Sequence, residues 1–293
     1  QDSAQHGERA VQAEFGSIVH YWHLYADDAP LRKKLIASMV VSGIALLIVL
    51  PGETRLEGKT GAPFGKSGTP DPWKAGKISS AAVYAVDQFY NTDTSTTFPV
   101  FIRTVSDAFD APPSSQPLVS GTTLFWLTLV TAKTQYLQTD SLDSGLVSPN
   151  TYYQTANPFT VYHGSATRLQ LIAQGQQSRP GDVANGGRDP AAAAATLSAG
   201  VTSTVSINLV DSYYNLVTGP NPFVTAAEAV MPQVRVCTTD PHDGDPVSAG
   251  FPLTGCPSPD DDPALSWGLA PAAAVLVSGT RNFPMRMVTR CNG

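Results

Sequence analysis

The sequence carries little charge. Asp, Glu, Lys and Arg make up 14% of its 293 residues, and the net charge is −6. No basic stripe is present to neutralise phosphates, so we do not expect nucleic acid as a partner. Gly and Pro, by contrast, number 24 each. Low charge, many turn residues and many short apolar runs favour β-sandwiches over helical bundles.

Catalytic signatures are also lacking. Neither GxSxG nor HExxH occurs in the chain. The stretch GAPFGKS at 61–67 resembles a phosphate-binding loop, but it has three residues between its glycines where the motif needs four. His20 and His23 stand three apart in an aromatic stretch, so on a strand they face opposite sides and share no metal. We therefore predict that the protein is not an enzyme and needs no cofactor.

Cysteine is scarce. Cys237 and Cys256 bracket a stretch rich in Pro, Asp and Gly, and no spacing suits a zinc site. We predict a disulfide between these two, with free buried thiols as the alternative. Cys291 is then free or bonded between chains. A disulfide indicates an oxidising location outside the cytoplasm. The chain begins at Gln1 rather than Met, so we expect that a leader was removed.

An internal repeat organises the rest. AGKISSAAVYAVDQFYN (75–91) returns as AGVTSTVSINLVDSYYN (199–215), 124 positions later. Each copy alternates as a half-buried strand, with inward-facing positions at Ala81, Val83 and Ala85 and at Val205, Ile207 and Leu209. Each then ends in Asp and Asn four residues apart, at Asp87 and Asn91 and at Asp211 and Asn215. These residue types predict a tight corner, with Asn in the left-handed conformation.

The similarity extends upstream. ALLIVLPGE (45–53) aligns with LQLIAQGQQ (169–177), where Leu169 and Leu171 are predicted inward and Gln170 outward. By this alignment 45–50 is a strand, and the apolar run 35–50 is not a membrane span. The same alignment turns Leu46 and Ile48 outward, so we expect a partner to cover them.

A third match has a separation of 158. LVSGTTLFWLTLVT (118–131) aligns with LVSGTRNFPMRMVT (276–289), which implies an insertion of about 34 residues in the second copy. Together the three matches predict strands at 45–50, 79–87, 124–131, 167–173, 203–211 and 283–289.

The combination of LPGE, a Gly-rich loop, AVDQFYN and LVSGTTLFWLTLVTA resembles the immunoglobulin-like repeats of bacterial surface proteins of the invasin and adhesin kind. The resemblance covers about residues 44–293. It implies an all-β fold with two tandem immunoglobulin-like β-sandwiches and an N-terminal extension. We divide the chain into an N-terminal arm (1–43), a first domain (44–165) and a second domain (166–293) with an insertion containing Asp, Pro and Cys. Such repeats form rods, stalks or assembly modules at the cell surface.

The second copy has little sequence after MVT, whereas the first continues into strand-like segments around 135–138 and 159–163. A sandwich short of a strand exposes an apolar groove that a strand of another chain can fill. The apolar stretch 14–26 of the arm is a candidate donor to a neighbouring copy, and such contacts build filaments. The predicted subunit interface comprises Ile18, Val19, His20, Tyr21, Trp22, Leu24, Tyr25, Leu46, Ile48, Phe283, Met285 and Met287.

Two alternatives stay open. Acidic loops offer weak calcium ligands at Asp107, Asp110, Asp240 and Asp243, although solvated acidic turns are the favoured interpretation. The main functional prediction is an extracellular, secreted subunit that forms a homopolymer. The alternative is a surface adhesin or stalk that binds a host, cell-surface or glycan ligand without polymerising.

Overall fold

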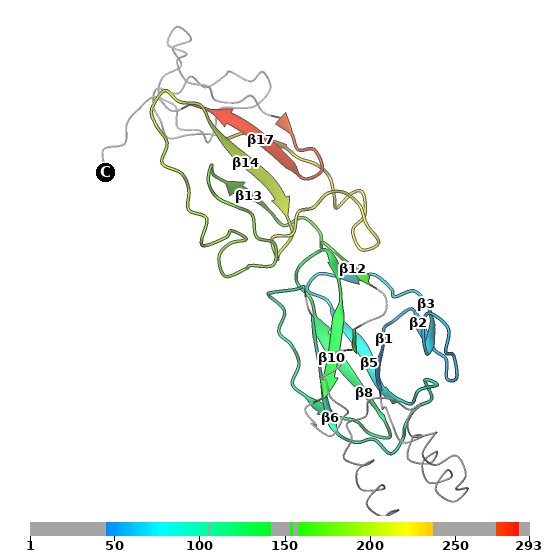
Figure 1. Ribbon diagram of the computed structural model, residues 1–293. Helices are drawn as coiled ribbons and strands as arrows, with labels where there is room; N and C mark the ends of the chain where they lie inside the picture. Colours follow the sequence, from blue (N-terminus) through cyan, green and yellow to red (C-terminus); the bar gives the residue numbers. More distant parts are fainter. Residues whose placement is uncertain (1–44, 105, 142–152, 155–157, 237–273, 287–293) are drawn as a thin grey trace, which may run out of the picture.

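The protein is an all-β sandwich protein built from two modules placed end to end (Figure 1). The computed structural model describes residues 45–104, 106–141, 153–154, 158–236 and 274–286. The first module contains the described residues between 45 and 163, and the second those between 166 and 286. Among the described residues every regular element is a strand, and no helix capable of crossing a membrane occurs there.

The strands of the first module are β1 (Ala45–Val49), β2 (Glu53–Arg55), β3 (Lys66–Gly68), β4 (Trp73–Lys74), β5 (Ile78–Val86), β6 (Pro99–Thr104), β7 (Gln116–Pro117), β8 (Thr122–Thr128), β9 (Thr134–Gln135), β10 (Leu137–Ser141), β11 (Tyr153–Gln154) and β12 (Phe159–Tyr162). The second module has β13 (Arg168–Ile172), β14 (Ser203–Val210), β15 (Gln233–Val234), β16 (Ala274–Val275) and β17 (Thr280–Met285). All six predicted strands are found, with ends that differ by a few residues where the structure describes them; residues 287–289 of the last prediction lie outside the described residues.

Two facing sheets enclose the core of the first module. One has the order β1-β5-β8 and the other β11-β10-β6-β7, while β4-β12-β9 and the hairpin β2-β3 lie beside them. Ala81, Val83 and Phe125 of the first sheet and Ile102 and Leu137 of the second belong to one buried cluster. The alternation predicted for β5 is confirmed, because Ala81, Val83 and Ala85 are fully buried.

The second module repeats the first sheet as β13-β14-β17. Val205, Ile207 and Leu209 are buried with Phe283 and Met285, as predicted for the inward face. Opposite this sheet the described residues contribute only the pair β15-β16. The two modules therefore have the same first sheet, and the described part of the second sheet is smaller in the second module.

The repeat is preserved in the backbone. Tyr90 and Tyr214 have φ angles of 63° and 62°, and Ser120 and Ser278 have φ angles of 49° and 48°. These are left-handed conformations that non-glycine residues rarely adopt, so their recurrence shows that both copies fold alike. The sequence predicted this conformation for Asn91 and Asn215; in the structure the preceding tyrosine adopts it instead.

The upstream alignment was off by one residue in the first module. Leu46 pairs with Ala85 and Leu169 pairs with Leu209, so Leu46 corresponds to Leu169. Directly opposed residues share a face of the sheet. Leu46 and Ile48 therefore face the core and are buried, and the prediction that they point outward is wrong. A shift of one residue exchanges the two faces of a strand.

Candidate functional site: the joint and the uncovered face

Many of the predicted site residues lie outside the described residues. They are Ile18, Val19, His20, Tyr21, Trp22, Leu24, Tyr25, Met287, Cys237, Cys256, Cys291, Asp240 and Asp243. Four predicted interface residues are described, and all four are core residues of their own module: Leu46, Ile48, Phe283 and Met285.

Two leucines on the core side of β13 are exposed, and no described strand lies over them. Leu169 and Leu171 lie on the same face as Leu209 and Ile207, as predicted, yet they are 51% and 40% exposed. Their counterparts in the first module, Leu46 and Ile48, are 4% and 1% exposed. In the first module β1 contacts β10 and β11, and the described strands of the second module include no counterpart of either. In its described part the second module thus presents an apolar strip where the first module is closed.

On the other face of β13 a polar residue is buried. Gln170 is 3% exposed and donates to the carbonyls of Gly186 and Gly187, at 2.9 and 2.8 Å. Its amide is satisfied by hydrogen bonds, which removes most of the cost of burying it. The loop at Gly186 and Gly187 therefore covers the outer face of β13, whereas the described residues leave the inner face open.

The second corner, Asp211–Asn215, joins the two modules. Asn215 Nδ2 donates to the carbonyl of Val130, and Asn215 Oδ1 accepts from the amide of Ala132, both at 2.8 Å. Asp211 Oδ2 also accepts from the amide of Gly164 in the connection between the modules, at 2.8 Å. Both Asp211 and Asn215 are 1% exposed. The corner predicted from the repeat is therefore also an interface.

Close packing completes this joint. Tyr213 packs against the core of the first module, and a side chain built at Gly76 would collide with its ring. A side chain at Gly181 of the second module would likewise collide with Thr131 and Phe109. Glycine at these two positions is what permits the two surfaces to meet.

Asp107 holds the loop that receives Asn215. It is 4% exposed, and its carboxylate accepts from the amides of Val130 and Thr131, both at 2.8 Å, and from the Thr131 hydroxyl at 2.7 Å. Phe109 donates a further amide hydrogen bond at 3.1 Å. These protein donors bond both carboxylate oxygens of Asp107, one of the four aspartates that the sequence offers as weak calcium ligands. No cluster of three or more metal-binding side chains occurs in the part of the chain that the structure describes.

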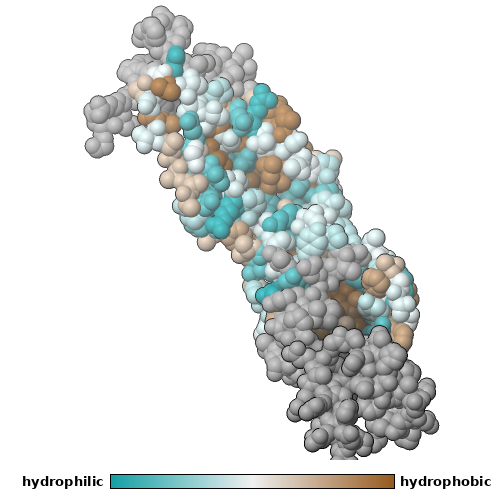
Figure 2. All heavy atoms as spheres, viewed as in Figure 1, coloured by the Kyte–Doolittle hydropathy of each residue, from teal (hydrophilic) through white to brown (hydrophobic). Residues whose placement is uncertain are grey.

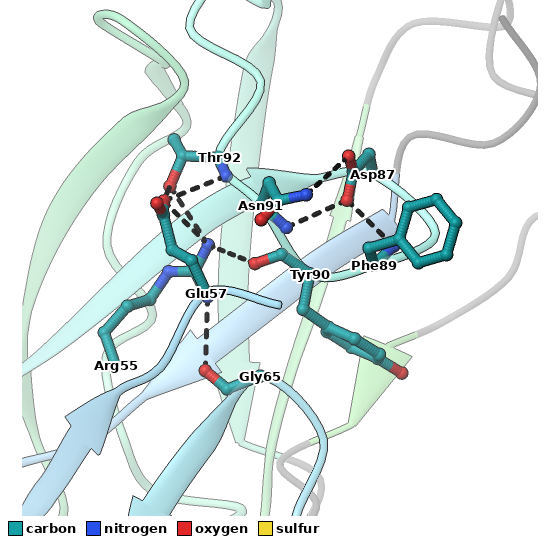
Figure 3. A network of polar contacts seen from close by, with 8 residues as sticks. All are labelled: Arg55, Glu57, Gly65, Asp87, Phe89, Tyr90, Asn91 and Thr92. Atoms are coloured by element: carbon teal, nitrogen blue, oxygen red, sulfur yellow. Dashed lines mark hydrogen bonds and ion pairs between the residues drawn. The ribbon is translucent and has the colours of Figure 1, made fainter. Parts of the chain in front are cut away.

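The first corner, Asp87–Asn91, has the same internal geometry. Asp87 Oδ1 accepts from the amides of Phe89 and Asn91 at 2.8 Å, and Asp87 Oδ2 accepts from Asn91 Nδ2 at 3.0 Å. Figure 3 shows this corner beside Arg55, whose Nη2 donates to the carbonyl of Tyr90 at 2.7 Å. Unlike its counterpart, the corner is open to solvent: Asn91 is exposed and Phe89 is 52% exposed.

A groove of about 850 Å³ lies on the first module. Prolines and aromatic rings dominate its lining, which includes Pro63, Phe64, Pro70, Pro72, Phe159 and Tyr162. The sequence prediction missed both this groove and the joint. The repeated Asp-x-x-x-Asn spacing signalled the corner but not its partner, since the partner atoms at Val130 and Ala132 belong to the backbone.

Comparisons with known proteins add little. No family model and no curated protein sequence matches the chain. Among solved structures, domains 4–9 of the surface layer protein SbsC match with a TM-score of 0.25 and 13% identity, over 65% of this chain and 23% of that one. Domains 5–6 of the S-layer protein SbsC match with a TM-score of 0.25 and 12% identity, over 69% of this chain and 74% of that one. A TM-score of 0.25 is too low to transfer a function from either structure.

Proposed function

We propose that the chain is a non-enzymatic structural subunit of an extracellular surface assembly, built from immunoglobulin-like modules and polymerising head to tail with copies of itself. The observation that carries this proposal is the uncovered strip at Leu169 and Leu171. In the first module the equivalent leucine and isoleucine are closed off beneath β10 and β11. A strand from another copy fits the open position.

The arm of a neighbouring copy is the proposed donor. Residues 14–26 are apolar and strand-forming. Fully burying a large apolar side chain contributes about 1.5–3 kcal/mol, so covering the exposed halves of Leu169 and Leu171 contributes about 1.5–3 kcal/mol in total, in addition to backbone pairing and the burial of the donor's own side chains. In the first module β10 pairs with β6. The second-module counterpart of β6 is β15, and we assign the donated strand to the position beside β15 that β10 occupies beside β6.

Electron microscopy of the purified full chain tests the proposal. We expect fibres with a repeat along their axis. Deleting residues 1–30 should leave the first module folded and abolish the fibres, and a peptide of residues 14–26 should bind the truncated chain. Leu169→Asp with Leu171→Asp should also abolish fibres, whereas the control Leu124→Asp, at a position 45% exposed on β8, should not. Fibres that survive both the deletion and the β13 double substitution would exclude strand donation.

The groove on the first module supports a second candidate, a surface adhesin that binds without polymerising. Aromatic rings and prolines, such as Phe64, Tyr162 and Pro70, form flat apolar surfaces on which a sugar or an extended peptide can stack. Compact particles in the microscope, together with glycan-array binding that Phe64→Ala and Tyr162→Ala abolish, would favour this candidate.

A further inference from the structure

We propose that the first corner of one copy docks on the Gly200 turn of a second copy and so repeats, between subunits, the joint that links the two modules within one chain. The Gly200 turn comprises residues 198–201, and the equivalent Gly76 turn comprises residues 74–77. This inference rests on the proposed head-to-tail assembly and names the surfaces that meet in it.

The two turns have the same backbone. Gly76 and Gly200 both have φ of 76°, and each turn is closed by one hydrogen bond, from Lys77 to Lys74 at 3.0 Å and from Val201 to Ser198 at 3.1 Å. Their surroundings differ. The Gly76 turn lies against Tyr213, whereas a Cβ built at Gly200 meets no atom within 4 Å. The second module therefore has the turn that receives a corner, with its surface open.

The corners show the converse difference. Asn215 is 1% exposed in the joint, whereas Asn91 is exposed, and Phe89 stands in the place of Tyr213 with 52% of its surface in solvent. Gly181 contacts the first module and lies three residues after Ser178, which forms a bridge with Arg188. Gly58 has the corresponding place in the first module, three residues after Arg55, which pairs with Lys66. A Cβ built at Gly58 meets no atom within 4 Å. Both halves of the joint are thus present a second time, each without its partner among the described residues.

The geometry places these surfaces at opposite ends of the molecule. The Gly76 turn precedes β5 at the joint, and the first corner follows β5 at its far end. A nine-residue strand spans about 30 Å, so the corner lies at the end of the first module away from the joint. In the second module the order is reversed: the second corner is at the joint, and the Gly200 turn is at the far end. Docking the first corner of one copy on the Gly200 turn of another therefore adds copies in line and does not close a ring.

The N-terminal arm leaves from the same end as the first corner. Ala45, the first residue of β1, pairs with Val86, which immediately precedes Asp87. A copy that docks its first corner on another copy therefore brings the start of its own arm to that copy's second module. Corner docking and strand donation are compatible, and they involve the same two subunits.

The first corner is also held in shape before it binds. Arg55 Nη2 donates to Tyr90 O at 2.7 Å and to Thr92 Oγ1 at 3.0 Å, and Glu57 accepts from the Thr92 hydroxyl at 2.6 Å (Figure 3). A corner that is already rigid loses little conformational entropy on docking. Phe89 then supplies an apolar ring for the Gly200 turn, as Tyr213 does for the Gly76 turn.

Sedimentation velocity of the full chain over a concentration series tests the inference. Phe89→Ala should weaken self-association at least tenfold, and Gly200→Ala should do the same, because its methyl group occupies the place of the ring. The control Trp126→Ala, at an aromatic residue of β8 that is 56% exposed and lies outside the corner, should associate like the wild type. Circular dichroism checks that each variant is folded, and Phe89 is exposed enough that its removal leaves the module intact.

Combining the variants sharpens the test. Both substitutions remove the same contact, so their effects should not add. The double variant Phe89→Ala with Gly200→Ala should therefore self-associate as well as the more weakly associating of the two single variants. A mixture of the two single variants should give a one-to-one complex, since one retains the corner and the other the turn. If both single variants assemble as the wild type does, this inference fails while the proposed function stands. If the wild type stays monomeric at every concentration, the proposed function fails with it.

Discussion

At the residue scale, the clearest difference between the modules is a buried ion pair. Lys66 Nζ lies 2.8 Å from Glu53 Oε2 and donates to the carbonyl of Ile48 at 2.9 Å, with side chains that are 1% and 0% exposed. In the second module Arg188 takes the place of Lys66 and donates to the carbonyl of Leu171 at 2.9 Å, but it is only half-buried. The equivalent carbonyls of Ile48 and Leu171 thus each accept a hydrogen bond from a cationic side chain, which is fully buried in the first module and half-buried in the second.

We expect Lys66→Met to destabilise the first module by about 3–5 kcal/mol, because removing one partner leaves the Glu53 carboxylate buried without its cation. The matched control, Arg188→Met, should cost the second module less than about 1 kcal/mol, because its guanidinium is close to water. Hydrogen-exchange mass spectrometry in urea reports the two modules separately. Equal losses in both would show that the burial of Lys66 does not matter.

Residue-scale predictions from the sequence succeeded where alternation was strong. In β5 and β14 small or apolar side chains occupy every second position, and their inward faces were predicted correctly. In β1 all five residues are apolar, so the pattern carries no information on which face is which. The one-residue shift at Leu46 and Ile48 follows from that uniformity.

At the element scale, the corner after β5 is held by carboxylates whose titration is shifted. Burial acts to raise the pKa of Asp87, but hydrogen bonds from Asn91 and the Phe89 amide outweigh it and lower that pKa below 3.8. Hydrogen bonds from Ser95 and Thr96 lower the pKa of Asp93 in the same way. Burial has the opposite result at Asp110, where it raises the pKa above 3.8.

These directions predict the response to acid. The stability contributed by Asp87 and Asp93 is present above pH 3.8 and is lost as the pH falls through their lower folded-state values. The contribution of Asp110 has the opposite sign: it is present below pH 3.8 and is lost as the pH rises through the higher folded-state value. Carboxyl-carbon NMR titration should therefore give midpoints below 3.8 for Asp87 and Asp93 and above 3.8 for Asp110. A midpoint for Asp87 at or above 3.8 would contradict the hydrogen-bonded corner.

The sequence predicted the long strands of both first sheets but not the short elements. Pairs such as β2-β3 and β15-β16 contain two or three residues per strand, too few to show a period. The candidate site was predicted in part. The corner was identified as a turn, but its role in the joint depends on tertiary contacts with Val130 and Ala132 that no local pattern encodes.

At the scale of the whole molecule, the joint decides whether the two modules behave as one rod. Figure 2 shows them as a continuous elongated body, in which hydrophilic and hydrophobic residues are intermixed on the visible face. Hydrogen bonds from Asn215 and the contact of Tyr213 with the Gly76 turn cross the junction. Relative motion of the modules must break these contacts.

Gly76→Ala should loosen the rod. Its methyl group would collide with Tyr213, and overpacking of this kind costs about 1–3 kcal/mol. We expect small-angle scattering from dilute monomer to show a broader distribution of distances than in the wild type. Gly200→Ala is the matched control: it has the same φ of 76° but no neighbour within 4 Å, so the monomer should keep the wild-type profile. Indistinguishable profiles for all three proteins would mean that Tyr213 does not fix the joint.

The hydrogen bonds of Asn215 have a consequence for how such chains diversify. Its amide meets a carbonyl at Val130 and an amide at Ala132, which are groups that almost any residue supplies. Selection on the junction therefore falls on the Asp, the aromatic ring and the Asn of one module, and on the other side mainly on the facing glycine and on Asp107, which holds the receiving loop. Val130 and Ala132 of the receiving loop can change in sequence as long as the path of its backbone is kept, whereas Thr131 also bonds Asp107 through its hydroxyl. Neighbouring units could then be duplicated, exchanged or reordered by recombination without a matching change in the unit next to them.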